Sequence, residues 1–181
     1  SWTIETVNGT SWAGAWDYIS SETCNAQLLL VQETHLRGEA ARRAEQHAWA
    51  AGWRLSMHDA LAIEHGTSGG VAIATRKHHG LAEFDMLGGD VDGRVRFLHW
   101  SAWTRGGLLV ASVYFHTGLG INGDNVAIME QLGAHVSAIG RPFSLGDDWQ
   151  CTAEEMQLCG FPRRMGAKVV APFAEFPTKC S

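Results

Sequence analysis

Apolar and polar positions near the amino terminus alternate in a way that predicts a strand followed by a short helix. Residues 1–7 alternate apolar and polar side chains, as a half-buried strand does, and the turn-forming pair Asn8-Gly9 ends the pattern. Three apolar residues then follow at the spacing of one helical face: Trp12, Trp16 and Ile19. Thr10 or Ser11 is placed to cap that helix, so a β-α unit opens the chain.

The middle of the chain predicts several strands and one further helix. The apolar run that ends in Glu33 favours a strand buried on both faces. The alanine-rich segment 39–51, followed by Gly52, predicts a helix with a C-terminal glycine. Further strands are expected at 53–57, 71–74, 94–103 and 108–114, the last two joined as a hairpin.

The last third of the chain continues the pattern with two helices between strands. Residues 125–139 have the clearest helical spacing, and 142–145 predict a strand that runs into Gly146-Asp147-Asp148. Thr152 and Glu155 form a capping box for a short helix, and 168–170 suggest one more strand. The order β-α-β-α, several strands, then α-β-α-β predicts a layered α/β domain with partly antiparallel sheets.

Composition narrows the class of protein without naming a function. A chain of 181 residues with 45% hydrophobic residues suits a single domain spanning 1–181, and its longest apolar runs are too short to cross a bilayer. Only 18% of residues are charged and 8 are tryptophan. These values fit a glycine-rich enzyme with a large core, which composition slightly favours, or a subunit that hides part of its surface.

The net charge and the spacing of cysteine and histidine argue against a strongly basic nucleic-acid-binding face and against a zinc centre. The net charge of −5 does not favour a strongly basic nucleic-acid-binding face, although a local basic groove stays open. The 4 cysteines show no zinc-ligand spacing, and the 9 histidines are dispersed. A zinc centre is therefore not expected.

Four polar residues stand at or just after the ends of predicted strands: Asn8, Glu33, Tyr114 and Asp148. Ligands of α/β sheets bind at the carboxyl ends of strands. Carboxylates suit Mg²⁺, and phosphodiester cleavage needs such a cation, a positioned water and donors to phosphate oxygens. Each residue also has a plainer interpretation. Asn8 could be a turn residue and Glu33 a solvated strand end, while Tyr114 could belong to the core and Asp148 to a loop.

In this order the motifs resemble those of the endonuclease/exonuclease/phosphatase superfamily, over the whole chain. Gln32-Glu33-Thr34-His35 resembles the QE-T-H motif and 66–73 the SGGVAI strand. Residues 110–114 resemble the strand that ends in the active-site tyrosine, 145–150 the GGDWN or GDFN signature, and Pro177-Thr178 a later PT motif. The similarity is greatest to endonuclease domains of non-LTR (LINE-type) retroelements. It implies a DNase-like α/β sandwich.

The resemblance also implies a role for each site residue. Glu33 would ligate Mg²⁺, and Asn8 would help to hold the metal site. Tyr114 would contact the phosphate, and Asp148 would orient or deprotonate the attacking water. Gln150 stands where the family has asparagine, so its amide lies one methylene further out, and a displacement of about 1 Å can lower a rate roughly 10²-fold. Asp147 replaces a glycine of the signature and is expected to add negative charge beside the site.

The family's closing SDH motif does not occur before the last residue, Ser181. Either the sequence is part of a longer polypeptide, or other protein subunits cover the missing sheet edge. We therefore expect an impaired enzyme that acts as an accessory or structural subunit of a larger assembly. The alternative is an active Mg²⁺-dependent endonuclease or phosphodiesterase that is completed outside this sequence. The compartment stays open, between the nucleus and an organelle reached after amino-terminal processing.

Overall fold

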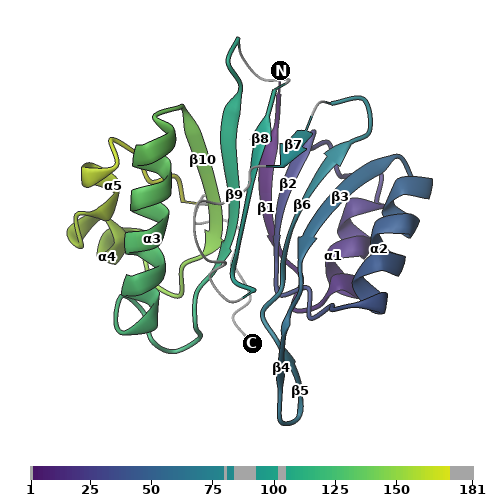
Figure 1. Cartoon of the computed structure of the whole chain (residues 1–181), viewed down its shortest axis with the longest axis horizontal. Coiled ribbons are helices and arrows are strands. Elements are labelled where there is room, and N and C mark those ends of the chain that lie inside the picture. Colours follow the sequence, from purple (N-terminus) through teal and green to yellow (C-terminus); the bar gives the residue numbers. More distant parts are fainter. Residues whose placement is uncertain (1, 80, 84–92, 102–104, 172–181) are drawn as a thin grey trace.

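The computed structural model describes residues 2–79, 81–83, 93–101 and 105–171, with only the backbone at 81–83. Its main feature is a pair of sheets that face each other (Figure 1). The first has the order β1 (Ile4–Asn8), β2 (Leu28–Gln32), β6 (Val71–Arg76), β3 (Trp53–His58). The second has the order β10 (Phe143–Asp148), β9 (Leu108–Tyr114), β8 (Val95–Trp100), β7 (Leu81–Glu83).

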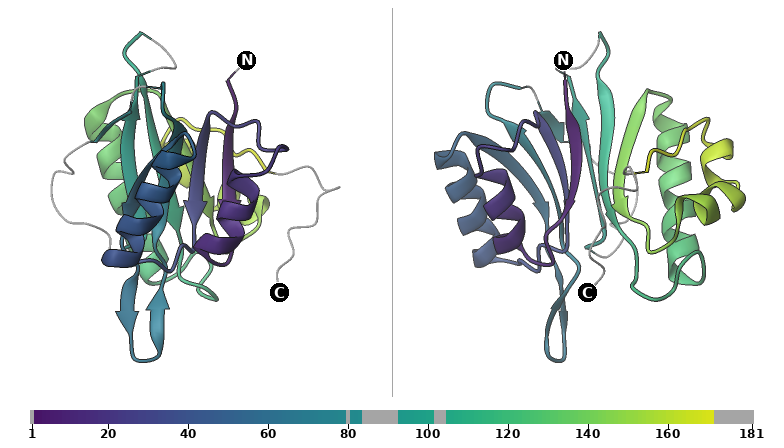
Figure 2. Two further views of the ribbon diagram at one scale, coloured as in Figure 1. Left: turned by 90° about the vertical axis from the view of Figure 1, so that its right-hand side faces the viewer. Right: turned by 180° about the vertical axis from the view of Figure 1, so that it is seen from behind.

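Helices cover the outer face of each sheet (Figure 2). The first sheet is covered by α1 (Trp12–Ile19) and α2 (Glu39–Ala50), and the second by α3 (Asp124–Ile139), α4 (Ala153–Leu158) and α5 (Phe161–Arg164). The resulting helix–sheet–sheet–helix order buries one face of every helix and both faces of the sheets. The predicted layered α/β sandwich is therefore confirmed.

Three hydrophobic clusters hold these layers together. Side chains of β2 alternate between them: Leu28 and Leu30 face the other sheet, whereas Leu29 and Val31 face α1 and α2. All five residues of β2 are buried, as the continuous apolar run predicted. Each fully buried apolar side chain of this size contributes roughly 1.5–3 kcal/mol, so β2 is a central stabilising element.

Strand direction brings the predicted site residues to one end of the molecule. β1 runs parallel to β2 with Asn8 opposite Gln32, and β10 runs parallel to β9 with Asp148 opposite Tyr114. The remaining pairs within the two large sheets are antiparallel. The carboxyl ends of β1, β2, β9 and β10 lie at the same end of the molecule, where Asn8 contacts Asp148 and Tyr114 contacts Glu33.

Most predicted elements are present, with local corrections. Ser11 caps α1, Gly140 ends α3 with a left-handed φ of 60°, and the capping box of α4 forms. The strand expected at 168–170 is wrong: this described segment is irregular and Val170 is 90% exposed, since no strand pairs with it there. Pro177-Thr178 lies outside the described residues.

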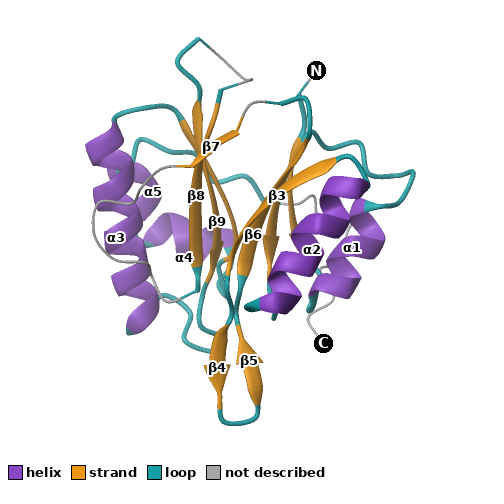
Figure 3. Cartoon of the chain, turned by 45° about the vertical axis from the view of Figure 1, so that its right-hand side comes forward, coloured by secondary structure: helices purple, strands orange, loops and turns teal. Residues whose placement is uncertain are grey.

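A projecting hairpin was not predicted. Its strands, β4 (Leu61–Ile63) and β5 (Gly66–Ser68), extend beyond the body of the molecule at the end where the site residues lie (Figure 3). Strands of three residues are too short to show a period in the sequence. Within the residues that the structure describes, no helix is long and apolar enough to cross a membrane.

Candidate active site

The site is built from two hydrogen-bonded pairs, each of which joins one sheet to the other. In the first pair, the Asn8 Nδ2 group at the end of β1 donates to Asp148 Oδ2 at the end of β10, at 2.8 Å. Asn8 Oδ1 also accepts from the Thr10 backbone N–H at 2.9 Å, which is the turn geometry expected of an Asn-Gly sequence. Asn8 is thus both a turn residue and a site residue.

In the second pair, the Tyr114 hydroxyl at the end of β9 donates to the Glu33 carboxylate just after β2. The Tyr114 hydroxyl also lies 3.0 Å from Thr117 Oγ1. Burial, followed by the hydrogen bond to Glu33, raises the pKa of Tyr114 to about 12. Tyr114 therefore keeps its proton near neutral pH and serves as a hydrogen-bond donor.

Gln150 lies next to the first pair, but its side chain is not what contacts Asp148. Its backbone N–H is 3.4 Å from Asp148 Oδ1, and its φ of 49° is left-handed. The structure therefore places Gln150 at the site, through the backbone.

Backbone strain concentrates at this edge. Among the described residues, the non-glycine residues with positive φ are Thr10, Glu33, His35 and Gln150. Each is, or lies within two residues of, a predicted site residue. Such conformations cost about 1–3 kcal/mol each and persist only where surrounding contacts enforce them, and they are concentrated at functional sites.

The QE-T-H and SGG motifs pack directly against each other and shape the loop that carries Glu33. Thr34 N–H donates to Gly70 O and His35 N–H to Gly69 O, both at 3.0 Å. A Cβ added at Gly70 would lie only 2.4 Å from Thr34 Oγ1. The two motifs therefore form one structural unit, and Gly70 is required by close packing rather than by a turn alone.

Asp147 differs from its sequence-based interpretation. Successive strand residues face opposite sides, so its side chain faces the helix layer while Asp148 faces the site. Burial, with the nearby Asp148 charge, holds the pKa of the Asp147 carboxyl well above its usual range. The expected placement of this carboxyl beside the site is corrected, because its side chain lies on the helix side of β10, where burial disfavours the charged form.

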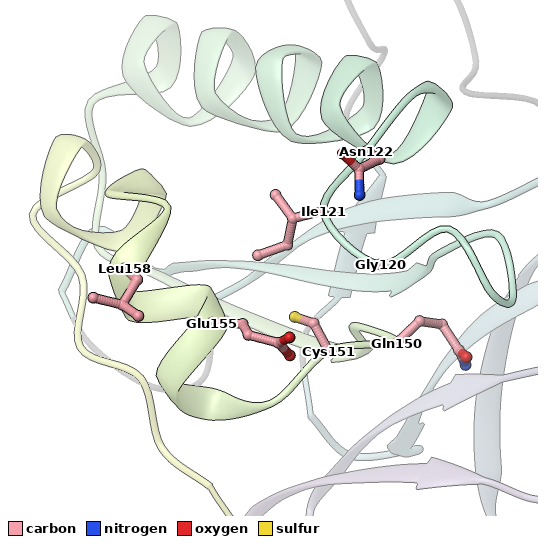
Figure 4. A pocket seen from close by; sticks show the side chains of 7 residues that line it. All are labelled: Gly120, Ile121, Asn122, Gln150, Cys151, Glu155 and Leu158. Atoms are coloured by element: carbon pink, nitrogen blue, oxygen red, sulfur yellow. The ribbon is translucent and has the colours of Figure 1, made fainter.

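A shallow cavity of about 300 Å³ lies beside Gln150, between the loop after β9 and the start of α4 (Figure 4). It is lined by Gly120, Ile121, Asn122, Gln150, Cys151, Glu155 and Leu158. The buried Asn125 holds the loop: its Oδ1 accepts from His116 N–H at 2.7 Å, and its Nδ2 donates to His116 O and Gly120 O. Sequence reasoning missed Thr117 and Asn125, since nothing local marks a loop-supporting hydroxyl or amide.

The side chains that could act as metal ligands indicate which kind of metal could bind. No group of three His, Cys, Asp or Glu side chains with metal-binding geometry occurs in the described part of the chain. A zinc-type cage is therefore not formed by these residues. Mg²⁺ is commonly held by one or two carboxylates together with water and substrate oxygens, and Glu33 at an open polar edge fits that kind of ligation.

Comparison with known proteins identifies the fold. No family model and no curated protein matches the sequence. Solved structures match by shape, among them the endonuclease domain of TRAS1, a telomere-specific non-LTR retrotransposon, with a TM-score of 0.62 and 18% identity over 92% of this chain. AP endonuclease LMAP from Leishmania major matches with a TM-score of 0.61 and 14% identity over 91%. The 3'-5' exonuclease NExo from Neisseria meningitidis matches with a TM-score of 0.54 and 14% identity over 90% of this chain.

All three are of the endonuclease/exonuclease/phosphatase superfamily, and the chain has the same DNase-like α/β sandwich fold. The match spans 71%, 66% and 70% of those chains respectively. The fold implied by the sequence motifs is thus confirmed.

Proposed function

We propose that this chain carries a Mg²⁺-dependent phosphodiesterase site, formed by Asn8, Glu33, Tyr114 and Asp148 and slowed by Gln150. The observation that carries the proposal is that the two hydrogen-bonded pairs, Asn8–Asp148 and Tyr114–Glu33, lie at the same end of the two sheets, where several non-glycine residues have positive φ. Strand direction brings the four residues to one end of the molecule, but it does not require that they be polar or that they hydrogen-bond from sheet to sheet. A common reaction centre accounts for both features.

Each side chain has a chemical role that follows from its contacts. As water attacks phosphorus, the P–O bond to the leaving oxygen breaks, and the Asp148 carboxylate accepts the proton of that water. The leaving oxygen departs with the bonding electron pair and takes a proton from solvent. The Asn8 amide N–H holds the Asp148 carboxylate in place. The single hydroxyl proton of Tyr114, which goes to Glu33 in this structure, would be donated to a phosphate oxygen when substrate is bound. Glu33 would hold Mg²⁺, which neutralises the charge that develops on the phosphate in such reactions.

Nucleic acid is the substrate class that we propose, because the proteins with this fold described above are named as nucleases. The cavity beside Gln150 lies next to the reacting edge and mixes apolar Ile121 and Leu158 with polar Asn122 and Glu155. Such a lining suits an uncharged sugar or base rather than a second phosphate, because Glu155 carries an acidic group.

The test is hydrolysis of plasmid DNA and of bis(p-nitrophenyl) phosphate with and without Mg²⁺. We expect activity that EDTA removes and that Glu33→Ala lowers by about 10²-fold or more, since it removes a group placed where charge develops. Glu22→Ala is the matched control, because Glu22 is exposed in the turn after α1. Equal rates for the wild type and Glu33→Ala would refute the proposal.

A second function, as a non-catalytic accessory subunit, is favoured by a different observation. Among the described strands, β1 and β10 each pair with one neighbour, and these two edge strands contact each other. Open edges present unpaired N–H and C=O groups that another chain can extend. Trp2 and Trp49 are also 40% and 55% exposed. The proposed partners are therefore protein subunits that cover the β1 and β10 edges.

Native purification followed by hydrogen exchange separates the two functions. An accessory subunit is expected to purify in a larger complex in which the backbone amides of β1 and β10 exchange more slowly than in the isolated chain. A free, stable monomer in native extracts would contradict this role. It would leave the catalytic proposal untouched, because that one is tested by Glu33→Ala.

A further inference from the structure

Arg94 is a buried arginine that lies against Tyr114. It is 5% exposed, and its guanidinium carbon is 5.0 Å from the centroid of the Tyr114 ring, within the range of a cation–π contact. The backbone ties the same two residues together, since Tyr114 N–H donates to Arg94 O at 2.8 Å. Ring and guanidinium are thus held as one unit.

The loop that carries the SGG motif fixes the other side of the guanidinium. Arg94 Nη2 donates to Ser68 Oγ at 3.1 Å, and a Cβ built on Gly69 would come within 3.7 Å of the guanidinium carbon. The Gly69 backbone carbonyl also accepts from the His35 N–H, in the loop that positions Glu33. Arg94 therefore connects the support of Tyr114 to the support of Glu33.

Arg94 is buried against the ring whose hydroxyl contacts Glu33. The Tyr114 hydroxyl is shared between Glu33 and Thr117, and these contacts restrain only the outer end of the ring. Arg94 contacts the ring itself and so restrains its tilt. It also places positive charge near a site that otherwise contains Glu33 and Asp148, and that charge favours an anionic substrate.

We propose that Arg94 is a positioning residue: it holds Tyr114 in the orientation that donates to the phosphate, and it acts through that ring without touching substrate. This inference rests on the proposed phosphodiesterase function for its kinetic consequence. Its structural part, the coupling of Arg94 to Tyr114, can be measured without any activity.

The kinetic test compares Arg94→Met with Arg96→Met. Arg96 is a matched control on the same stretch of chain, and its guanidinium contacts Ser56 Oγ at 3.0 and 2.7 Å. With bis(p-nitrophenyl) phosphate and Mg²⁺, Arg94→Met is expected to lower kcat by about 10–100-fold, as loss of a supporting partner does elsewhere, while KM changes little. Arg94→Lys retains the charge and should recover part of kcat. Arg96→Met should keep the wild-type kcat.

The spectroscopic test uses the fact that the chain has only 2 tyrosines, Tyr18 and Tyr114. Labelling with [¹³Cζ]tyrosine gives two NMR signals, and Tyr18→Phe assigns them. At fixed neutral pH, Arg94→Met should move the Tyr114 signal and leave the Tyr18 signal in place, whereas Arg96→Met should move neither.

The outcomes are distinguishable. An inactive wild type would refute the phosphodiesterase proposal, and the NMR comparison would then decide the Arg94 inference alone. An active wild type with equal kcat in Arg94→Met and Arg96→Met, or an unmoved Tyr114 signal, would overturn the inference. Should Arg94→Met fail to fold, Arg94→Lys against Arg96→Lys supplies the same comparison, with a several-fold lower kcat expected only for Arg94→Lys.

Discussion

Gln150 adopts a backbone conformation that suits asparagine better than glutamine. Its φ is 49°, and asparagine is among the residues enriched in the left-handed region. Asparagine also has the amide one methylene closer to the backbone. Asparagine at position 150 would therefore differ from glutamine both in its tolerance of this φ and in the reach of its amide.

The variant Gln150→Asn is expected to gain a few tenths to about 1 kcal/mol in free energy of unfolding, because the strained φ becomes better tolerated. It should also raise kcat/KM roughly tenfold or more if the amide then reaches the reacting group. Urea denaturation and phosphodiester kinetics measure the two effects. Gln157→Asn on α4 is the control and should not change kcat/KM, so equal kinetics in all three proteins would contradict the prediction.

Asp147 should make the protein less stable as pH rises. Its folded-state pKa is raised by burial, so the folded state retains a proton that the unfolded chain releases. The stabilisation is fully present below the ordinary aspartate pKa and is lost as pH rises through the folded-state value, at up to about 1.4 kcal/mol per pH unit. Asp147→Asn should flatten this dependence and be the more stable protein at pH 7.

Unfolding in urea at a series of pH values tests this expectation. Asp17→Asn provides the control, because Asp17 is exposed on α1 and should leave the slope unchanged. A wild-type slope that persists in Asp147→Asn would show that another group is responsible.

At the scale of elements, α4 depends on its capping box. Thr152 Oγ1 accepts from Glu155 N–H at 3.1 Å, and the Glu155 carboxylate accepts from Thr152 N–H at 2.8 Å. A helix as short as Ala153–Leu158 has little intrinsic stability, so these end contacts carry much of it. Because α4 also forms one wall of the cavity beside Gln150, the cap supports the site as well as the helix.

Thr152→Ala is expected to lower the free energy of unfolding by about 1 kcal/mol, within the 0.5–2 kcal/mol range of lost caps. Thr152→Ser, which retains the hydroxyl, should lie close to the wild type. Thermal or urea unfolding measures both, and a Thr152→Ala protein as stable as Thr152→Ser would show that the cap contributes nothing.

At the scale of the whole molecule, the two sheets are in close contact where Gly146 of β10 meets Leu30 of β2. A Cβ added at Gly146 would lie 2.5 Å from Leu30 Cδ1 and 2.9 Å from Leu30 Cβ. Gln32 crosses the same interface, with its Nε2 3.0 Å from Ser112 Oγ. The interface sets how the two halves of the site meet, because Asn8 and Glu33 belong to one sheet and Asp148 and Tyr114 to the other.

Gly146→Ala should therefore destabilise the fold by about 1–3 kcal/mol, as overpacking does. Leu30→Ala removes the Cδ1 atom 2.5 Å from the new methyl group and leaves the Cβ contact at 2.9 Å, so it relieves part of the overpacking. The double variant should therefore be more stable than the sum of the two single changes predicts. Denaturant unfolding of the four proteins measures this coupling. Strict additivity would show that the sheets can separate without cost at this point.

The regular elements followed from local patterns, because their causes lie within a few residues. The all-apolar β2, the periodic α3 and the Thr152–Glu155 capping box are set by side-chain spacing and short-range contacts. The four site residues at strand ends could be named for the same reason, together with their resemblance to a family. The segments 61–68 and 168–170 were misjudged because a few residues carry too little period to distinguish a strand from a loop.

The arrangement of the site depended instead on long-range contacts. Asn8 meets Asp148 from 140 residues away, and Tyr114 meets Glu33 across the same sheet interface. The raised pKa of Asp147 and the burial of Arg94 depend on the layers that surround them, which no local pattern encodes. The residue types therefore predicted the candidate chemistry, whereas the geometry and the electrostatics of the site arise from burial and from the packing of the two sheets.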